Sequence, residues 1–231
     1  MSHLRDIDPG NLVIWFVALL FSLSFHEASH AWTSEKFGDD TGRLQGRITL
    51  NPLPHVDPVG SILLPAVLAL FHSPVVLGWA KPVPIQWANL RNPRNDPVKV
   101  ALAGPVANLL LAVAFAVIVR LAPSPDAPGG GWASFLAPLS VMGYAGVVMN
   151  CGLALFNLIP VPPLDGSWVL MRFLPLRHII TLQQFRLLGI ALVAILLSSH
   201  RVSHFVLEGP LRATVRACLG LVGAPDVGAE F

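Results

Sequence analysis

The sequence predicts an all-α polytopic membrane protein with about four to six transmembrane helices. Of its 231 residues, 54% are hydrophobic and only 12% are charged, whereas charged residues make up about a quarter of a typical soluble domain. Long apolar stretches follow one another along the chain, and a helix of roughly 20 apolar residues spans a bilayer core. Because no polar linker divides these stretches, we expect one membrane-embedded domain over residues 1–231, with its core at about 11–170 and a C-terminal helix and tail at 171–231.

The first apolar stretch, "NLVIWFVALLFSLSFHEASHAWTS", predicts a helix from about Asn11 to Ser34. We expect it to be retained as a membrane helix, because no small-residue cleavage site of a signal peptide follows it. Three further helices are expected, over about Val98–Leu121, Ser134–Ile159 and Ile179–Ser199. The tail from Arg201 is expected to hold a short helix at the membrane interface.

The chain between the first two of these helices is rich in Pro, Gly, Asn and β-branched residues. It contains "GRITLNPLPHVDPVGS" and "GWAKPVPIQWANLRNP", and the apolar segment from Val59 is broken by Pro65 and Pro74. Non-helical backbone is tolerated at membrane depth only where protein or water covers its polar groups. We therefore expect a re-entrant, partly extended segment there.

Three ionisable residues stand together in the first helix, in "SFHEASHAW". His26 and His30 are four residues apart, so both can point a ring nitrogen at one ion, and zinc accepts two such ligands. Glu27, next to the first histidine, can act as a general base, which is the arrangement that metal-assisted peptide hydrolysis needs. Because ionisable residues inside a membrane are costly and usually functional, the motif predicts a metal site.

The third metal ligand has four candidates in the sequence alone: Glu35, His55, Asp57 and Asp165. If the segment from Val59 crosses the membrane, Asp165 lies about 30 Å from the first helix's motif, on the opposite face. If that segment is re-entrant, the end of the helix before Asp165 shares a face with the motif.

The distribution of Lys and Arg favours the re-entrant topology. With that topology, ten of the 15 basic residues lie on the side of the histidine motif, and basic loops favour the cytoplasm. These residues are Lys36, Arg43, Arg47, Lys81, Arg91, Arg94, Lys99, Arg172, Arg177 and Arg186. We therefore expect the site to face the cytoplasmic side.

Charge and cysteine content exclude other classes of protein. The formal net charge is only +2 and the basic residues are scattered, so we expect no nucleic-acid partner. The two cysteines, Cys151 and Cys218, form neither a metal-binding pair nor a disulfide framework in their spacing.

Three motifs together resemble the site-2 protease family of intramembrane zinc metalloproteases. They are "HEASH" in the first helix, "ALAGPVANLLLA" opening the helix near Val98, and "FNLIPVPPLDG" closing the next one. The resemblance covers roughly residues 20 to 170 and is closest to the short bacterial branch without PDZ or CBS domains. Ser29 stands where the family commonly has Gly or Ala, and Ser167 stands where a second Gly often follows. Both serines are small, and neither change removes a ligand or the base.

The resemblance implies one Zn²⁺ per chain, bound by His26, His30 and Asp165, with Glu27 as the general base. Asn157 would bind substrate or the developing oxyanion. His55 and Asn108 would bind substrate or support the ligands.

The implied activity is regulated intramembrane proteolysis, the hydrolysis of peptide bonds within transmembrane segments of other membrane proteins. The implied location is the lipid bilayer of the inner membrane of a bacterial cell, and a homo-oligomer or a regulatory membrane partner fits the family. Two other classes stay open, namely a metal- or haem-binding transporter or electron carrier, and an inactive membrane scaffold.

Overall fold

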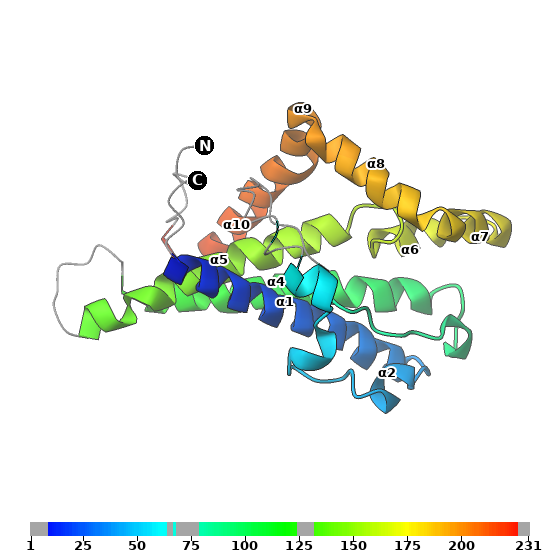
Figure 1. The fold of residues 1–231 in the computed structure, drawn as a ribbon, viewed down its shortest axis with the longest axis horizontal. Helices are drawn as coiled ribbons and strands as arrows, with labels where there is room; N and C mark the ends of the chain where they lie inside the picture. The colour runs from blue at the N-terminus through cyan, green and yellow to red at the C-terminus, as the bar shows by residue number, and fades with distance from the viewer. Residues whose placement is uncertain (1–8, 64–66, 68–78, 124–131, 226–231) are drawn as a thin grey trace.

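The computed structural model describes residues 9–63, 67, 79–123 and 132–225, and these residues contain helices but no β-strand. The predicted all-α class is thus confirmed. Three long helices, α1 (Pro9–Lys36), α4 (Asp96–Leu121) and α5 (Trp132–Asn157), lie alongside one another and pack pairwise (Figure 1). Each contains a stretch long and apolar enough to cross a membrane: Val13–Lys36, Asp96–Leu121 and Pro138–Asn157.

The three-helix bundle has large apolar side chains on its outside and small side chains where the helices meet, as a bilayer requires. On α1, Val13, Val17 and Phe21 are exposed at intervals of four residues, which places one apolar stripe on the outside of the helix. Small residues such as Ala112 and Ala116 of α4 are fully buried, and they let neighbouring backbones approach closely. The outer faces are therefore suited to lipid, and the helix contacts inside depend on small side chains.

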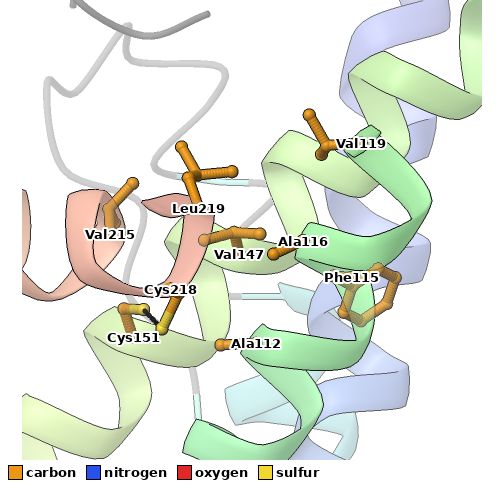
Figure 2. Packing of buried hydrophobic residues seen from close by; sticks show 9 residues of the cluster. All are labelled: Ala112, Phe115, Ala116, Val119, Val147, Cys151, Val215, Cys218 and Leu219. Carbon is orange, nitrogen blue, oxygen red and sulfur yellow. Dashed lines mark hydrogen bonds between the residues drawn. The ribbon is translucent and has the colours of Figure 1, made fainter. Parts of the chain in front are cut away.

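The largest cluster of buried apolar residues joins α4 and α5 to α10 (Gly209–Leu221). Figure 2 shows Cys218 of α10 beside Cys151 of α5 and Leu219 near Val147; Val215 of α10 belongs to the same cluster. The Sγ atoms of Cys151 and Cys218 are 3.9 Å apart, and both cysteines are free thiols. Their spacing in the sequence did not predict this contact, because it depends on where α10 packs.

The C-terminal part differs from the expected single helix over Ile179–Ser199. It is divided at Phe185 into α7 (Leu176–Gln184) and α8 (Arg186–Ser198). A Cβ on Gly189 would lie 1.9 Å from the Pro162 carbonyl oxygen, so α8 begins in close contact with the turn after α5. The tail continues as α9 (His200–Ser203), the π-helical η5 (His204–Glu208) and α10. Because α10 buries its apolar residues against α4 and α5, it belongs to the core; its place at the membrane interface stays a prediction.

Short elements and extended chain connect α1 to α4. The described elements are α2 (Thr41–Leu44), η2 (Leu53–His55), the π-helical η3 (Pro58–Leu63) and η4 (Trp87–Asn89). Residues 81–86 have no helical structure, as the sequence predicted. The apolar segment from Val59 lies mostly outside the described residues, so its re-entrant course stays a prediction. α6 (Gly166–Met171) follows α5 after a turn rich in proline.

The contact between Gly146 of α5 and the ring of Phe115 on α4 provides a test of this packing. A Cβ on Gly146 would lie 2.3 Å from the ring, so Gly146→Ala forces the two helices apart. Overpacking of this kind costs about 1–3 kcal/mol, which thermal unfolding in detergent will detect as a lower Tm. Gly152→Ala, on the same helix with nothing within 4 Å of the new Cβ, should not lower Tm, because alanine is the better helix former; equal Tm values for both variants would contradict the packing.

Candidate metal centre

The imidazoles of His26 and His30 lie one turn apart on α1 and face the interior of the bundle. Both are buried, and their Nε2 atoms are 3.1 Å apart. The rings meet edge to face, with centroids 4.6 Å apart. The predicted pairing of these two residues at one point is therefore present.

Helix α4 binds the far side of each imidazole. His26 Nδ1 is 2.5 Å from Asn108 Oδ1, and His30 Nδ1 is 2.7 Å from the Val100 carbonyl oxygen. A carbonyl oxygen can only accept a hydrogen bond, so the Nδ1 of His30 carries its proton. With Nδ1 protonated, the Nε2 of a neutral imidazole has a free lone pair, which is the form that binds a metal.

Asp165 completes the group from the turn between α5 and α6. Its Oδ2 lies 3.2 Å from His26 Nε2 and 3.4 Å from His30 Nε2. Ligand atoms that lie about 2.0–2.1 Å from a zinc ion stand about 3.3 Å apart in a tetrahedral site. The three measured separations match the edges of such a site. Of the four candidates for a third ligand, Asp165 is the one that the structure brings to the histidines.

The chemistry of these three atoms fits a cation. Oδ2 of Asp165 is buried and has no hydrogen-bond donor among the described residues, and it faces the two Nε2 atoms. Three electron-rich atoms without protons between them repel one another unless a positive charge lies at their centre. The described residues contain no second group of three metal-binding side chains of this kind.

Gly104 of α4 leaves the space that an ion needs. A Cβ at this position would lie 2.5 Å from His30 Nε2 and 2.7 Å from His26 Nε2. Any side chain there would occupy the point at which the ligand atoms converge. The glycine of the "ALAGP" motif is thus required by close approach to the histidines.

The turn that carries Asp165 is fixed by contacts on both sides. A Cβ on Gly166 would lie 2.1 Å from the Leu158 carbonyl oxygen, so only glycine permits the chain to fold back this tightly. Ser167 Oγ donates to the Leu164 carbonyl at 2.6 Å. The Trp168 ring packs on Trp87, with centroids 4.0 Å apart. These contacts tie the position of Asp165 to the chain that precedes α4.

Glu27 is partly buried and accepts a hydrogen bond from a backbone amide of that same chain. The Val83 N–H donates to Glu27 Oε2 at 2.9 Å. The flanking Lys81 and Gln86 amides donate to the His55 carbonyl at 2.8 Å and to Asp39 Oδ2 at 2.8 Å. The extended segment therefore lies along α1 and orients the Glu27 carboxylate beside the ligands.

Arg47 and His55 are buried polar residues that contact the extended segment at Lys81. Arg47 donates to the carbonyl oxygens of Pro54 and Lys81. Burial lowers the pKa of Arg47, and the charge of Glu27 opposes that shift. Burial also lowers the pKa of His55 in spite of its hydrogen bond to the Thr49 carbonyl, so His55 is neutral at pH 7. His55 thus joins backbone segments and is not in the ligand group.

The chain is similar in sequence to proteins named as zinc metalloproteases. It is 40% identical over 161 residues to "Putative zinc metalloprotease YwhC" of Bacillus subtilis (strain 168), and the match covers 69% of this chain and 68% of that protein. It is 32% identical over 157 residues to "Putative zinc metalloprotease Rip2" of Mycolicibacterium smegmatis and 31% identical over 161 residues to Rip2 of Mycobacterium tuberculosis. Each Rip2 match covers 68% of this chain and 56% of the relative, so the chain spans a little over half the length of these proteins.

No family model and no solved structure matches the chain. The similarity to YwhC extends over two thirds of both proteins. The chain belongs to the zinc metalloprotease family of YwhC and Rip2. Among the described residues of this zinc metalloprotease homologue, the three-residue group at Gly104 is the one that could hold a metal ion.

The other predicted site residues lie apart from the ligand group or support it. Asn108 contacts His26 directly. Asn157, the last residue of α5, donates to the Leu153 carbonyl at 3.0 Å, and its role stays a prediction. Glu35 pairs with Arg43 at 3.0 Å, and Asp57 accepts from the Val59 and Gly60 amides, so the structure places neither in the group of His26, His30 and Asp165.

Sequence reasoning missed two residues that support the centre. Asn150 of α5 is fully buried and binds Asn108, and Arg47 holds the chain that contacts Glu27. In the sequence, Asn150 stood out only as a polar residue within an apolar run. Arg47 stood out only as an arginine within the Pro- and Asn-rich segment.

A cavity of about 450 Å³ lies outside the centre, between the start of α4, α6 and the chain leading into α7. Its lining is mostly apolar and includes Arg94 and Arg172, but none of the four residues at the centre. The metal group of this metalloprotease homologue therefore does not line this cavity.

Substitution of Gly104 tests the geometry of the centre. Gly104→Ala should lower zinc affinity by about 10-fold or more, because the Cβ displaces the ligand nitrogens and displaced ligands cost such factors. Zinc content and competition with a chelator would measure this. Gly152→Ala should bind zinc as the wild type does; a Gly104→Ala protein with wild-type affinity would show that the ion does not sit there.

Proposed function

We propose that this chain is an intramembrane zinc endopeptidase of the site-2 protease type, which hydrolyses peptide bonds within transmembrane segments of membrane proteins. Its role would be regulated intramembrane proteolysis. One observation carries the proposal: His26, His30 and Asp165 converge at ligand distances inside a bundle of membrane-length helices, with Glu27 beside them. The family relation to YwhC and Rip2 supports the same chemistry.

Each residue has a defined task in this proposal. Zinc bound by His26, His30 and Asp165 would supply the Lewis acidity that activates a water and polarises the scissile carbonyl. Glu27 would take a proton from the attacking water and deliver it to the leaving amine. Asn157 would donate a hydrogen bond to the carbonyl oxygen as its negative charge develops.

The extended segment over residues 81–86 is the proposed contact for an unwound substrate chain. A helix hides its carbonyls in hydrogen bonds, so the substrate must unwind before cleavage. The N–H groups of Lys81 and Val83 donate hydrogen bonds to the His55 carbonyl and to Glu27. In an extended chain, the backbone groups of the alternate residues point to the opposite side. Two of these, Pro82 and Pro84, have carbonyls but no N–H, so strand addition there would use donors of the substrate.

We also propose the location of the enzyme and its orientation. The three apolar helices support an integral membrane protein, and the excess of Lys and Arg near the centre favours the cytoplasmic side of a bacterial inner membrane. This proposed orientation assumes that the segment after Val59 is re-entrant. We also propose a homo-oligomer or a regulatory membrane partner.

Substitution of the base tests the proposed chemistry. Glu27→Gln keeps an acceptor for the Val83 amide but cannot take a proton, so cleavage should fall by about 10²-fold or more while zinc content stays at that of the wild type. Purified protein would be incubated with a set of single-span membrane proteins that carry a tag at each end, and fragments would be counted.

Glu35→Gln is the matched control on the same helix. Its carboxylate pairs with Arg43 in a partly exposed ion pair, and pairs near the surface are worth little, so cleavage should be unchanged. Full cleavage by Glu27→Gln with zinc bound would show that Glu27 is not the base.

Single cysteines test the orientation. In a chain carrying Cys151→Ala and Cys218→Ala, Leu44→Cys near the centre and Leu121→Cys at the end of α4 place exposed thiols at opposite ends of the bundle. In intact spheroplasts, a membrane-impermeant maleimide should label only the second, and permeabilisation should expose the first. The reverse pattern would place the centre on the outer side.

A further inference from the structure

We infer that Asn150 is a positioning residue for the metal, because it fixes the tautomer of His26 through Asn108. Asn150 contacts neither the ligands nor the base, so its effect must pass through that neighbour. The inference rests on the proposed metal site, but it concerns a residue outside the three motifs that predicted that site.

A directed chain of hydrogen bonds joins α1, α4 and α5 at this point. Ser22 Oγ donates to the Ala18 carbonyl at 2.7 Å, and Asn150 Nδ2 donates to Ser22 Oγ and to the Gly146 carbonyl, each at 2.8 Å. Both hydrogens of that amide are thereby used, so Asn150 Oδ1 is left as an acceptor.

Asn108 continues the chain to the ligand. Its Nδ2 donates to Asn150 Oδ1 at 2.7 Å and to the Ser22 carbonyl at 3.3 Å. Its Oδ1 therefore faces His26 Nδ1, 2.5 Å away, and can only accept from it. His26 must carry its proton on Nδ1, which leaves the Nε2 lone pair directed at the metal position.

The opposite assignment fails at the backbone. If both amides were flipped, their oxygens would face the Gly146 and Ser22 carbonyls, which cannot donate. Ser22, Asn108 and Asn150 are completely buried. A polar group that is buried there without a hydrogen bond destabilises the fold, because water cannot replace the missing partner. The direction of the chain is thus set by two main-chain carbonyls.

Asn150→Leu tests the inference because it keeps the side-chain volume and removes the acceptor. Asn108 then keeps only its longer bond to Ser22 and can turn its Nδ2 towards His26. Zinc affinity, measured by chelator competition, should fall about 10-fold or more. The same substitution made in an Asn108→Leu background should cause no further loss, because the connection to His26 is already broken.

Cys151→Ala, at the next buried position of α5, is the control for altered packing and should keep wild-type affinity. Wild-type affinity in Asn150→Leu, or an equal loss in both backgrounds, would overturn the inference. These outcomes are independent of proteolysis. A wild-type protein that binds zinc through this network but cuts no substrate would refute the proposed function alone.

The proton on Nδ1 is also measured without metal or variant. In zinc-free protein with ¹⁵N-labelled histidine, NMR should find a proton on His26 Nδ1. A bare Nδ1 would overturn the inference even if Asn150→Leu fails to fold. Where that variant does fold, the proton on His26 Nδ1 should be partly lost.

Discussion

An imidazole buried between helices must satisfy one ring nitrogen before the other can serve as a ligand, and here α4 does this for both histidines. Asn108 and the Val100 carbonyl bind the two Nδ1 atoms, while Gly104 lies between them and leaves room at Nε2. Val100, Gly104 and Asn108 are on successive turns of α4. If α4 rotated about its axis or slid along α1, at least one of their three contacts with the histidines would be lost. The packing of α4 against α1 therefore fixes the positions of the two ligand nitrogens, and neither forms without the other.

The local part of the centre was predictable because helix geometry alone places it. A spacing of four residues puts His26 and His30 on one face and Glu27 beside them, whatever the rest of the fold. Asp165 was not predictable in this way, since its arrival depends on the direction in which α5 runs. Residue chemistry left it among four candidates, and the resemblance singled it out; the structure now supplies the distances.

The features that the sequence did not reveal depend on how helices face one another. Asn150 is one polar residue in an apolar run, and its partners follow only from the rotation of α5 against α1 and α4. The contact of Cys151 with Cys218 and the division of the expected C-terminal helix at Phe185 have the same origin, because both follow from where the C-terminal elements pack. Periodicity identifies an element and its apolar face, but not the partner of each side chain.

The hydrogen bond from Val83 to Glu27 has a mechanical consequence. The extended segment is bound at one end by Asp39 and, near Lys81, by the buried guanidinium of Arg47, so the amide that orients the base has little freedom of its own. A substrate chain that pairs with the outer edge of this segment would act on the backbone that holds Glu27. In the proposed function, substrate contact and placement of the base would then be coupled through the Val83 peptide group, and the orientation of Glu27 would depend on what lies against the edge.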